Sequence, residues 1–204
     1  MEFYEAVSKR RSVREFQQKP VEAEKLRRIL EAGLKAPSHN HLREWEFILL
    51  RDAERKKEVL KVEPSSHDFT KTEISEWTKG DKHQLVKEMY LKALPVQKKM
   101  LFDAPVLLVV CFRMRKALKD CRTLFDLNSF ASVWACIENI LLAMAAEGLY
   151  GVTKIPSETA DLKKALGIPE GYEIAAMIPI GYLKEYSVKQ IAVRLQEKVH
   201  YDRW

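Results

Sequence analysis

Apolar and polar residues alternate along this chain in two patterns, one typical of strands and one typical of helices. From Pro105 to Phe112 nearly every residue is apolar and many are β-branched, as in a strand buried on both faces. We therefore expect this strand at the centre of a sheet. Shorter apolar runs predict two more strands, from Glu46 to Arg51 and from Ile174 to Tyr182.

Two helices are expected before residue 40. The first is short and ends at Arg10, and the second starts at Pro20 and ends between Gly33 and Pro37. Their apolar residues recur at helical spacing: Phe3, Ala6 and Val7 in the first, and Leu26, Ile29, Leu30 and Leu34 in the second.

Two further helices are expected after the central strand. Residues 129–147 are apolar around most of the helix circumference, which predicts a helix that is deeply buried or packed against a partner chain. Ser157 is expected to cap a short helix that runs to Leu166 and stops at Gly167.

Residues 53–100 and the C-terminus have a different character. The first stretch is charged and helical in tendency, and it could form a helical lid over a ligand. The second, from Lys189 to Trp204, combines basic residues with an apolar thread and ends on aromatic side chains. Because Tyr and Trp are costly to leave in water, we expect this stretch to dock, across a dimer interface.

Composition narrows the function classes. At 204 residues the chain fits one domain, residues 1–204, with a sizeable core. Its net charge of +6 is spread over mixed-sign stretches, so we expect no nucleic-acid partner. The apolar runs are shorter than the roughly 20 residues of a membrane span, and the N-terminus lacks the order of a secretory signal. We therefore expect a cytoplasmic protein without a membrane partner.

Several chemistries are disfavoured by missing motifs. The sequence contains no Gly-rich dinucleotide fingerprint, Walker loop or nucleophile elbow. The three cysteines form no Cys-x-x-Cys pair, and the only close histidine pair, His39 and His41, falls in a predicted loop. No metal site is predicted.

The strongest candidate chemistry is an anion site in the run Arg10-Arg11-Ser12-Val13-Arg14. Arginine offers planar, bidentate donors that suit a phosphate and keeps its charge at any working pH. The alternative is that these arginines are surface charges at a helix end, where cations complement the helix dipole.

The wider sequence resembles the FMN-dependent nitroreductase family. The arginine run continues as Glu15-Phe16, Ala36-Pro37-Ser38 follows, and Trp45-Glu46-Phe47 comes after a loop of matching length. Further matches fall in the family's order: Asn139-Ile140-Leu141-Leu142-Ala143, Glu147-Gly148-Leu149, Lys154-Ile155-Pro156, Ile168-Pro169-Glu170-Gly171-Tyr172-Glu173 and Ile180-Gly181-Tyr182. The chain departs from the family at Arg43-Glu44, where many members have Gln-Pro, and at His41, where an Asn is usual.

The resemblance implies an α+β fold, with a central, mainly antiparallel sheet flanked by helices, in an intertwined homodimer with FMN at the interface. Arg14 would lie nearer the isoalloxazine ring and give electrostatic support, and no catalytic acid or base is implied. The implied FMN-binding residues form four groups: Arg10, Arg11, Ser12 and Arg14; Ser38, His39 and Asn40, from the other subunit, with His41 beside them in the loop; Lys154 and Ile155; and Lys189 and Arg194 near the C-terminus.

The implied activity is a ping-pong oxidoreduction. NADH or NADPH would give a hydride to flavin N5, and a small-molecule acceptor such as a nitroaromatic or a quinone would then be reduced. Two alternatives stay open. One is a deiodinase or flavin-fragmenting enzyme of the same superfamily, with Glu88, Tyr90 and Lys92 as candidates to hold a zwitterionic substrate. The other is a flavin-binding or basic interaction protein without turnover.

Overall fold

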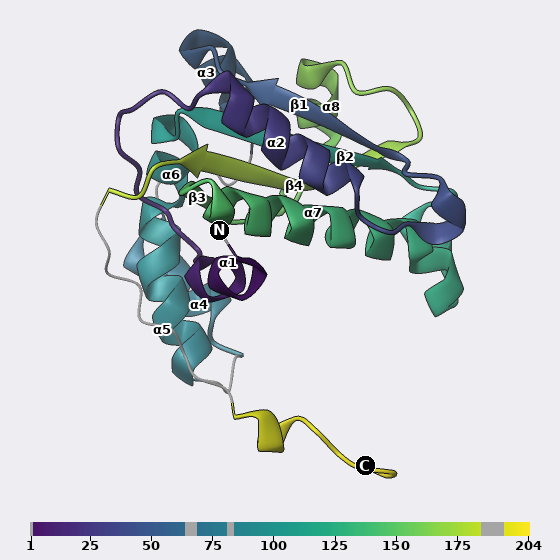
Figure 1. The fold of residues 1–204 in the computed structure, drawn as a ribbon. Helices are drawn as coiled ribbons and strands as arrows, with labels where there is room; N and C mark the ends of the chain where they lie inside the picture. The colour runs from purple at the N-terminus through teal and green to yellow at the C-terminus, as the bar shows by residue number, and fades with distance from the viewer. Residues whose placement is uncertain (1, 64–68, 81–83, 185–193) are drawn as a thin grey trace.

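A four-stranded sheet forms the centre of the computed structural model, which describes residues 2–63, 69–80, 84–184 and 194–204 (Figure 1). The strands are β1 (Trp45–Leu50), β2 (Val106–Arg113), β3 (Tyr150–Gly151) and β4 (Tyr172–Gly181). Their order is β1-β2-β4-β3, and every neighbouring pair is antiparallel. The predicted α+β fold is confirmed, and β2 lies inside the sheet as expected.

Side chains of β2 alternate between two hydrophobic clusters, one on each face of the sheet. Val106, Leu108, Val110 and Phe112 belong to the first cluster, and Leu107, Val109 and Cys111 belong to the second. This alternation follows from the two-residue period of a strand, and it explains why the sequence of β2 is apolar throughout. A register shift against β4 between Val110 and Cys111 marks a β-bulge.

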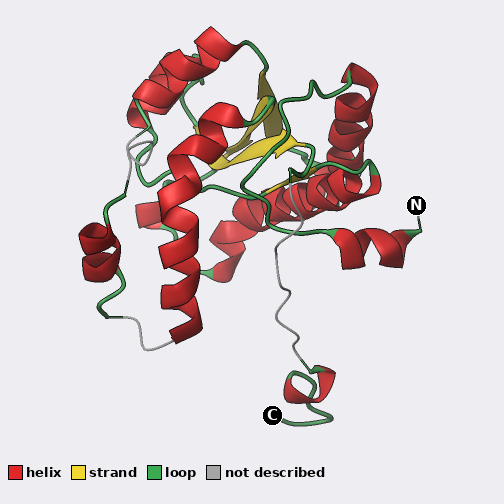
Figure 2. Ribbon diagram, turned by 90° about the vertical axis from the view of Figure 1, so that its left-hand side faces the viewer, coloured by secondary structure: helices red, strands yellow, loops and turns green. Residues whose placement is uncertain are grey.

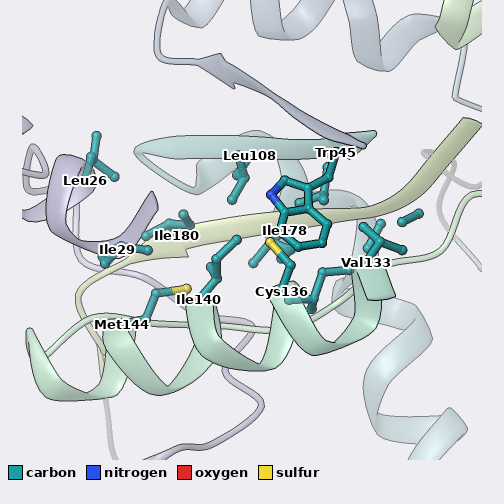
Figure 3. Close-up of a cluster of buried hydrophobic side chains, with 14 of the residues drawn as sticks. Leu26, Ile29, Trp45, Leu108, Val133, Cys136, Ile140, Met144, Ile178 and Ile180 are labelled. Atoms are coloured by element: carbon teal, nitrogen blue, oxygen red, sulfur yellow. The ribbon is translucent and has the colours of Figure 1, made fainter. Parts of the chain in front are cut away.

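The first face is covered by α2 (Ala23–Leu34) and α7 (Asn128–Ala146). Figure 3 shows α7 side chains, among them Ile140, pointing at the strands. A β-carbon at Gly33 would lie 2.8 Å from Ile140 Cγ1, so this glycine lets the two helices approach closely. The expected start of α2 at Pro20 was wrong, since the helix begins at Ala23. Leu34 was expected on the apolar face of this helix but is 47% exposed.

The second face is covered by α3 (Ala53–Lys61), α6 (Gln97–Asp103) and α8 (Ala160–Leu166). The N-cap of α8 is Thr159, and the expected cap at Ser157 was wrong. Gly167 ends this helix in a left-handed conformation, as expected.

Residues 53–100 divide into two parts. Because α3 and α6 bury Leu60 and Leu101 in the second cluster, they belong to the body of the protein and not to a lid. Among the described residues of this stretch, α4 (Lys71–Trp77), α5 (Gln84–Ala93) and the 3-10 turn η2 (Leu94–Val96) remain as candidates for a lid. Figure 1 shows α4 and α5 extending beyond the edge of the sheet.

Both ends of the chain lie outside the two layers. α1 (Phe3–Lys9) packs beside α7, and residues 194–204, with the turn η5 (Leu195–Glu197), extend away from the body in Figures 1 and 2. Tyr201 is 83% exposed and Trp204 fully exposed. The described part of this tail therefore does not dock on its own chain, and docking across a dimer interface stays a prediction.

Candidate functional site

Residues 10–16, called the arginine segment below, run beside the end of the sheet. α1 ends at Lys9, and Ser12 then forms a parallel bridge with Gly151. The backbone N–H of Val13 donates to Gly151 O at 3.0 Å. A β-carbon at Gly151 would lie 2.2 Å from Pro179 O, so this close approach requires glycine. The sheet thereby fixes the backbone of the arginine segment.

Arg14 is half-buried in this segment. Burial takes its guanidinium out of water and lowers the Arg14 pKa. Within the residues that the structure describes, Arg14 forms no ion pair, and no acceptor binds its guanidinium. Arginine nevertheless stays charged at neutral pH, and a desolvated cation without a partner is unfavourable. The side chain therefore suits an anionic ligand.

The other members of the arginine segment are partly engaged. Arg11 turns back over the end of α1, where its Nη1 donates to the carbonyl oxygens of Ser8 and, at 2.7 Å, of Arg10. Its Nε is buried and has no acceptor among the described residues. Arg10 Nε lies 3.5 Å from Glu138 Oε1 on α7, in an exposed pair. Arg11 Nε and the Arg14 guanidinium thus remain open to an acceptor from outside the described residues.

Lys154 lies on the sheet side of the same region, three residues after Gly151. Its backbone N–H and C=O pair with Met177 of β4, both at 2.8 Å. Its ammonium lies 3.2 Å from Glu63 Oε1, and their side chains are 9% and 0% exposed. Ile155, by contrast, is 57% exposed. Lys154 therefore turns its charge into the protein, and the exposed surface here belongs to Ile155.

The loop that carries Ser38, His39, Asn40 and His41 is held at the N-terminal part of α7. His39 N donates to Ser132 Oγ at 3.0 Å. Three residues of the loop have positive φ without being glycine, namely Asn40 at 51°, His41 at 56° and Arg43 at 46°. Such conformations cost about 1 kcal/mol or more each and often occur at functional sites.

The structure does not bring the predicted site together within one chain. The loop contacts α7 at Ser132, whereas the arginine segment contacts α7 at Glu138, roughly 9 Å further along the helix. Arg194 lies in the exposed tail, and Lys189 lies outside the described residues. Only the groups around Arg14 and Lys154 adjoin each other, through the bridge between Ser12 and Gly151.

Four residues that shape this region were not predicted: Glu63, Ser132, Glu138 and Gly151. Glu63 and Glu138 are carboxylates among many others, and nothing in their spacing marks them. Ser132 follows only from the packing of the loop on α7. Gly151 did carry a signal, because an isolated glycine beside a strand often marks a close backbone approach.

A family model provides an independent comparison. The model described as the nitroreductase family matches residues 7–182, which include the arginine segment, the whole sheet and Lys154.

Curated relatives and a solved structure agree with this match. Iodotyrosine deiodinase 1 of Rattus norvegicus is 28% identical over 187 residues, and the match covers 89% of this chain and 62% of that protein. Iodotyrosine deiodinase of Thermotoga neapolitana is 25% identical over 183 residues, covering 88% of this chain and 87% of that protein. A crystal structure of oxidised iodotyrosine deiodinase, bound to FMN and 3-iodo-L-tyrosine, superposes with a TM-score of 0.70 at 23% identity, covering 95% and 98% of the two chains. This structural likeness establishes the fold.

Proposed function

Because the chain belongs to the nitroreductase family, we propose that it binds FMN and acts as an NAD(P)H-dependent oxidoreductase. The observation that carries this proposal is Arg14, a desolvated cation with no described partner, fixed beside Gly151 by the sheet. A phosphate, or the negative charge that develops on a flavin, would supply the missing counter-charge.

The residues around Arg14 fit such a ligand. Ser12 is an exposed residue with a hydroxyl group, and Arg11 Nε is a buried donor without a described acceptor, so both can bind phosphate or ribityl oxygens. FMN, when bound, would supply the hydride chemistry between NADH or NADPH and a small acceptor such as a nitroaromatic or a quinone. The chain's own task is to bind, orient and stabilise charge, which requires no acid or base pair.

We further propose a homodimer that completes the site. Residues 124–146 are long and apolar enough to cross a membrane, yet one face of α7 packs on the sheet and 33% of the most apolar window is buried within the chain. Phe3 and Tyr4, on the adjoining α1, are 63% and 84% exposed. A second copy would cover such surface and could bring the loop at His39 to the partner's arginine segment. A membrane partner is not proposed.

A second candidate function is reductive dehalogenation of a halogenated tyrosine, favoured by the deiodinase relatives. The trio offered for substrate binding does not suit this role, however. Tyr90 packs on Trp77 at 4.5 Å between ring centroids, while Glu88 and Lys92 are exposed. Residues two apart on a helix point to opposite sides, so Tyr90 cannot join the other two around one ligand.

The test is reconstitution with FMN followed by reduction. The purified protein is incubated with FMN, desalted, and its absorption recorded from 300 to 550 nm before and after anaerobic NADH or NADPH. Flavin bands that bleach, and recover when a quinone or a nitroaromatic is added, would support the proposed oxidoreductase.

Other outcomes separate the alternatives. Bound flavin that neither nucleotide reduces, but that releases iodide from 3-iodotyrosine when reduced chemically, would favour the dehalogenase. Bound flavin that supports neither reaction would favour a protein without turnover. Absence of bound flavin would contradict the proposal.

A further inference from the structure

The ion pair between Glu63 and Lys154 is the most deeply buried charge pair in the described chain, and the proposed reaction does not use it. Glu63 Oε1 lies 3.2 Å from Lys154 Nζ, and the carboxylate side chain is fully buried. The same ammonium donates to Ile155 O at 2.8 Å. The other described pairs, such as Lys163 with Glu173 at 2.8 Å, leave much more of their side chains in water.

This arrangement joins two distant parts of the sequence. Glu63 follows the end of α3, on the second face of the sheet, and Lys154 follows β3, 91 positions later. Main-chain bonds to Met177 fix the backbone of Lys154, so the remaining freedom is the direction of its side chain. The bond to Ile155 O shows that the ammonium turns back over its own neighbour. Glu63 is the anion that favours this direction.

The direction of the Lys154 side chain affects the positive charge at the proposed cofactor site. Lys154 is three residues from Gly151, which bridges to Ser12 in the arginine segment. That segment already holds Arg14 without a described counter-charge. An ammonium without Glu63 would be a further unneutralised cation in the same region, and it would strengthen the positive potential there.

We propose that Glu63 is a positioning residue: its carboxylate holds the Lys154 ammonium against Ile155 O and thereby withholds one positive charge from the proposed FMN site. The part that concerns FMN rests on the proposed function. Glu63 thus sets how strongly the site favours the reduced, more negative state of a bound flavin, while Arg14 supplies the cation that the flavin meets.

The positioning claim is tested without FMN, by the reactivity of Lys154. Wild-type protein and Glu63→Gln are treated briefly with formaldehyde and a borane, and methylation of each lysine is followed by peptide mass spectrometry. A buried, paired amine reacts only when the structure opens locally, so Lys154 should react at least about tenfold faster in Glu63→Gln. The control, Glu173→Gln, breaks the more exposed pair with Lys163 and should leave Lys154 unchanged.

The charge claim is tested on protein loaded with FMN. Loss of Glu63 leaves an extra positive charge near the flavin, so the midpoint potential of Glu63→Gln should be more positive than that of the wild type. Glu63→Gln/Lys154→Met lacks both charges and should return to the wild-type potential. A change in packing alone would shift both variants, whereas a change in charge shifts only the first.

Each result supports or overturns one of these two claims. Equal methylation of Lys154 in the wild type and Glu63→Gln would overturn the positioning role, and a shifted potential in the double variant would overturn the charge role. If Glu63→Gln does not fold, the double variant should fold and bind FMN, because it no longer leaves the Lys154 ammonium buried without its carboxylate; a double variant that is equally disrupted would contradict the positioning role. A wild-type protein that binds no FMN would refute the proposed function, while the methylation result would still decide the positioning role.

Discussion

Lys154 and Arg14 are both withdrawn from water on adjoining segments, yet only one of them is neutralised. Lys154 has Glu63 at 3.2 Å and Ile155 O at 2.8 Å. Arg14, whose pKa is lowered by burial, has no counter-charge among the described residues. Both carry the same formal charge and lie on segments at the β3 side of the sheet, so the difference lies in the partners that the chain provides.

The contrast distinguishes a cation that the chain itself neutralises from one that we propose binds a ligand. Burying a charge is unfavourable unless it is paired and hydrogen-bonded, and for Lys154 the chain itself supplies the partner. For Arg14 the described residues supply no partner, so an anionic ligand would gain an interaction that water screens less than at the surface. An unpaired, desolvated arginine on a fixed backbone is therefore a better indicator of a binding site than the density of arginines in the sequence.

The largest effect should come from breaking the paired cation. Glu63→Gln leaves the Lys154 ammonium buried without its counter-charge, and removal of one partner of a buried pair typically costs about 3–5 kcal/mol. Urea unfolding of the FMN-free protein should show this loss. Glu63→Gln/Lys154→Met should recover more than half of this loss, because the Lys154 ammonium no longer remains without its carboxylate. Additive losses in the two single variants and the double variant would contradict a direct interaction.

Arg14→Met should give the opposite pattern. The free energy of unfolding without FMN should change by less than about 1 kcal/mol, because no described contact of the guanidinium is lost. FMN affinity should fall by about 1.5–3 kcal/mol, the range for hydrogen bonds to charged groups, or roughly tenfold to a hundredfold in a fluorescence titration. Arg27→Met, on the exposed side of α2, serves as the control and should bind FMN as the wild type does. Unchanged affinity in Arg14→Met would remove this residue from the site.

The sequence predicted much of this framework because its signals are local. The apolar run of β2 and the largely apolar circumference of α7 identified the central layers, and the cluster around Arg14 remains a predicted anion site. Capping was less predictable, since Ser157 and Thr159 are both good N-caps by residue type, and Thr159 occupies the N-cap without a side-chain hydrogen bond to the helix.

The distinction between Arg14 and Lys154 was not predictable from the sequence. The residue types show only that both side chains are cations, and the family resemblance implies that both bind the flavin. The pairing of Lys154 with Glu63 spans 91 positions and has no period or motif. Likewise, Arg11 belongs to the same arginine run as Arg14, and only the structure shows that it caps the end of α1.

Arg10 is intermediate between Lys154 and Arg14, because it is an exposed cation in a weak ion pair. Its Nε lies 3.5 Å from Glu138 Oε1, and about half of the Glu138 side chain is exposed. If Arg10 binds the FMN phosphate, Glu138 competes for it weakly, and exposed pairs contribute about 0.2–1 kcal/mol. Glu138→Gln should therefore bind FMN about two- to fivefold more tightly at low salt, and the gain should shrink as salt screens the pair. Weaker binding would instead mean that Glu138 orients Arg10 for the ligand.

The smallest effect should come from a paired cation that remains in water. Arg28 Nε and Nη2 donate to both carboxylate oxygens of Glu147, at 2.7 and 2.8 Å, between α2 and the end of α7. These bonds lower the Glu147 pKa below its ordinary value of 4.5. A carboxyl group with a lowered pKa in the folded state stabilises the protein above its ordinary pKa and loses this contribution as the pH falls through the lowered value.

Arg28→Met should therefore be slightly less stable than the wild type at pH 7, and the difference should vanish as the pH falls through the lowered Glu147 pKa. Urea unfolding of the two proteins between pH 3 and pH 7 measures this difference in the free energy of unfolding. Glu63→Gln, by contrast, should differ from the wild type far more at pH 7, although both substitutions remove one partner of an ion pair. Similar losses in the two variants would mean that burial does not distinguish these pairs, and the contrast between Lys154 and Arg14 would then no longer identify Arg14 as the cation left open for a ligand.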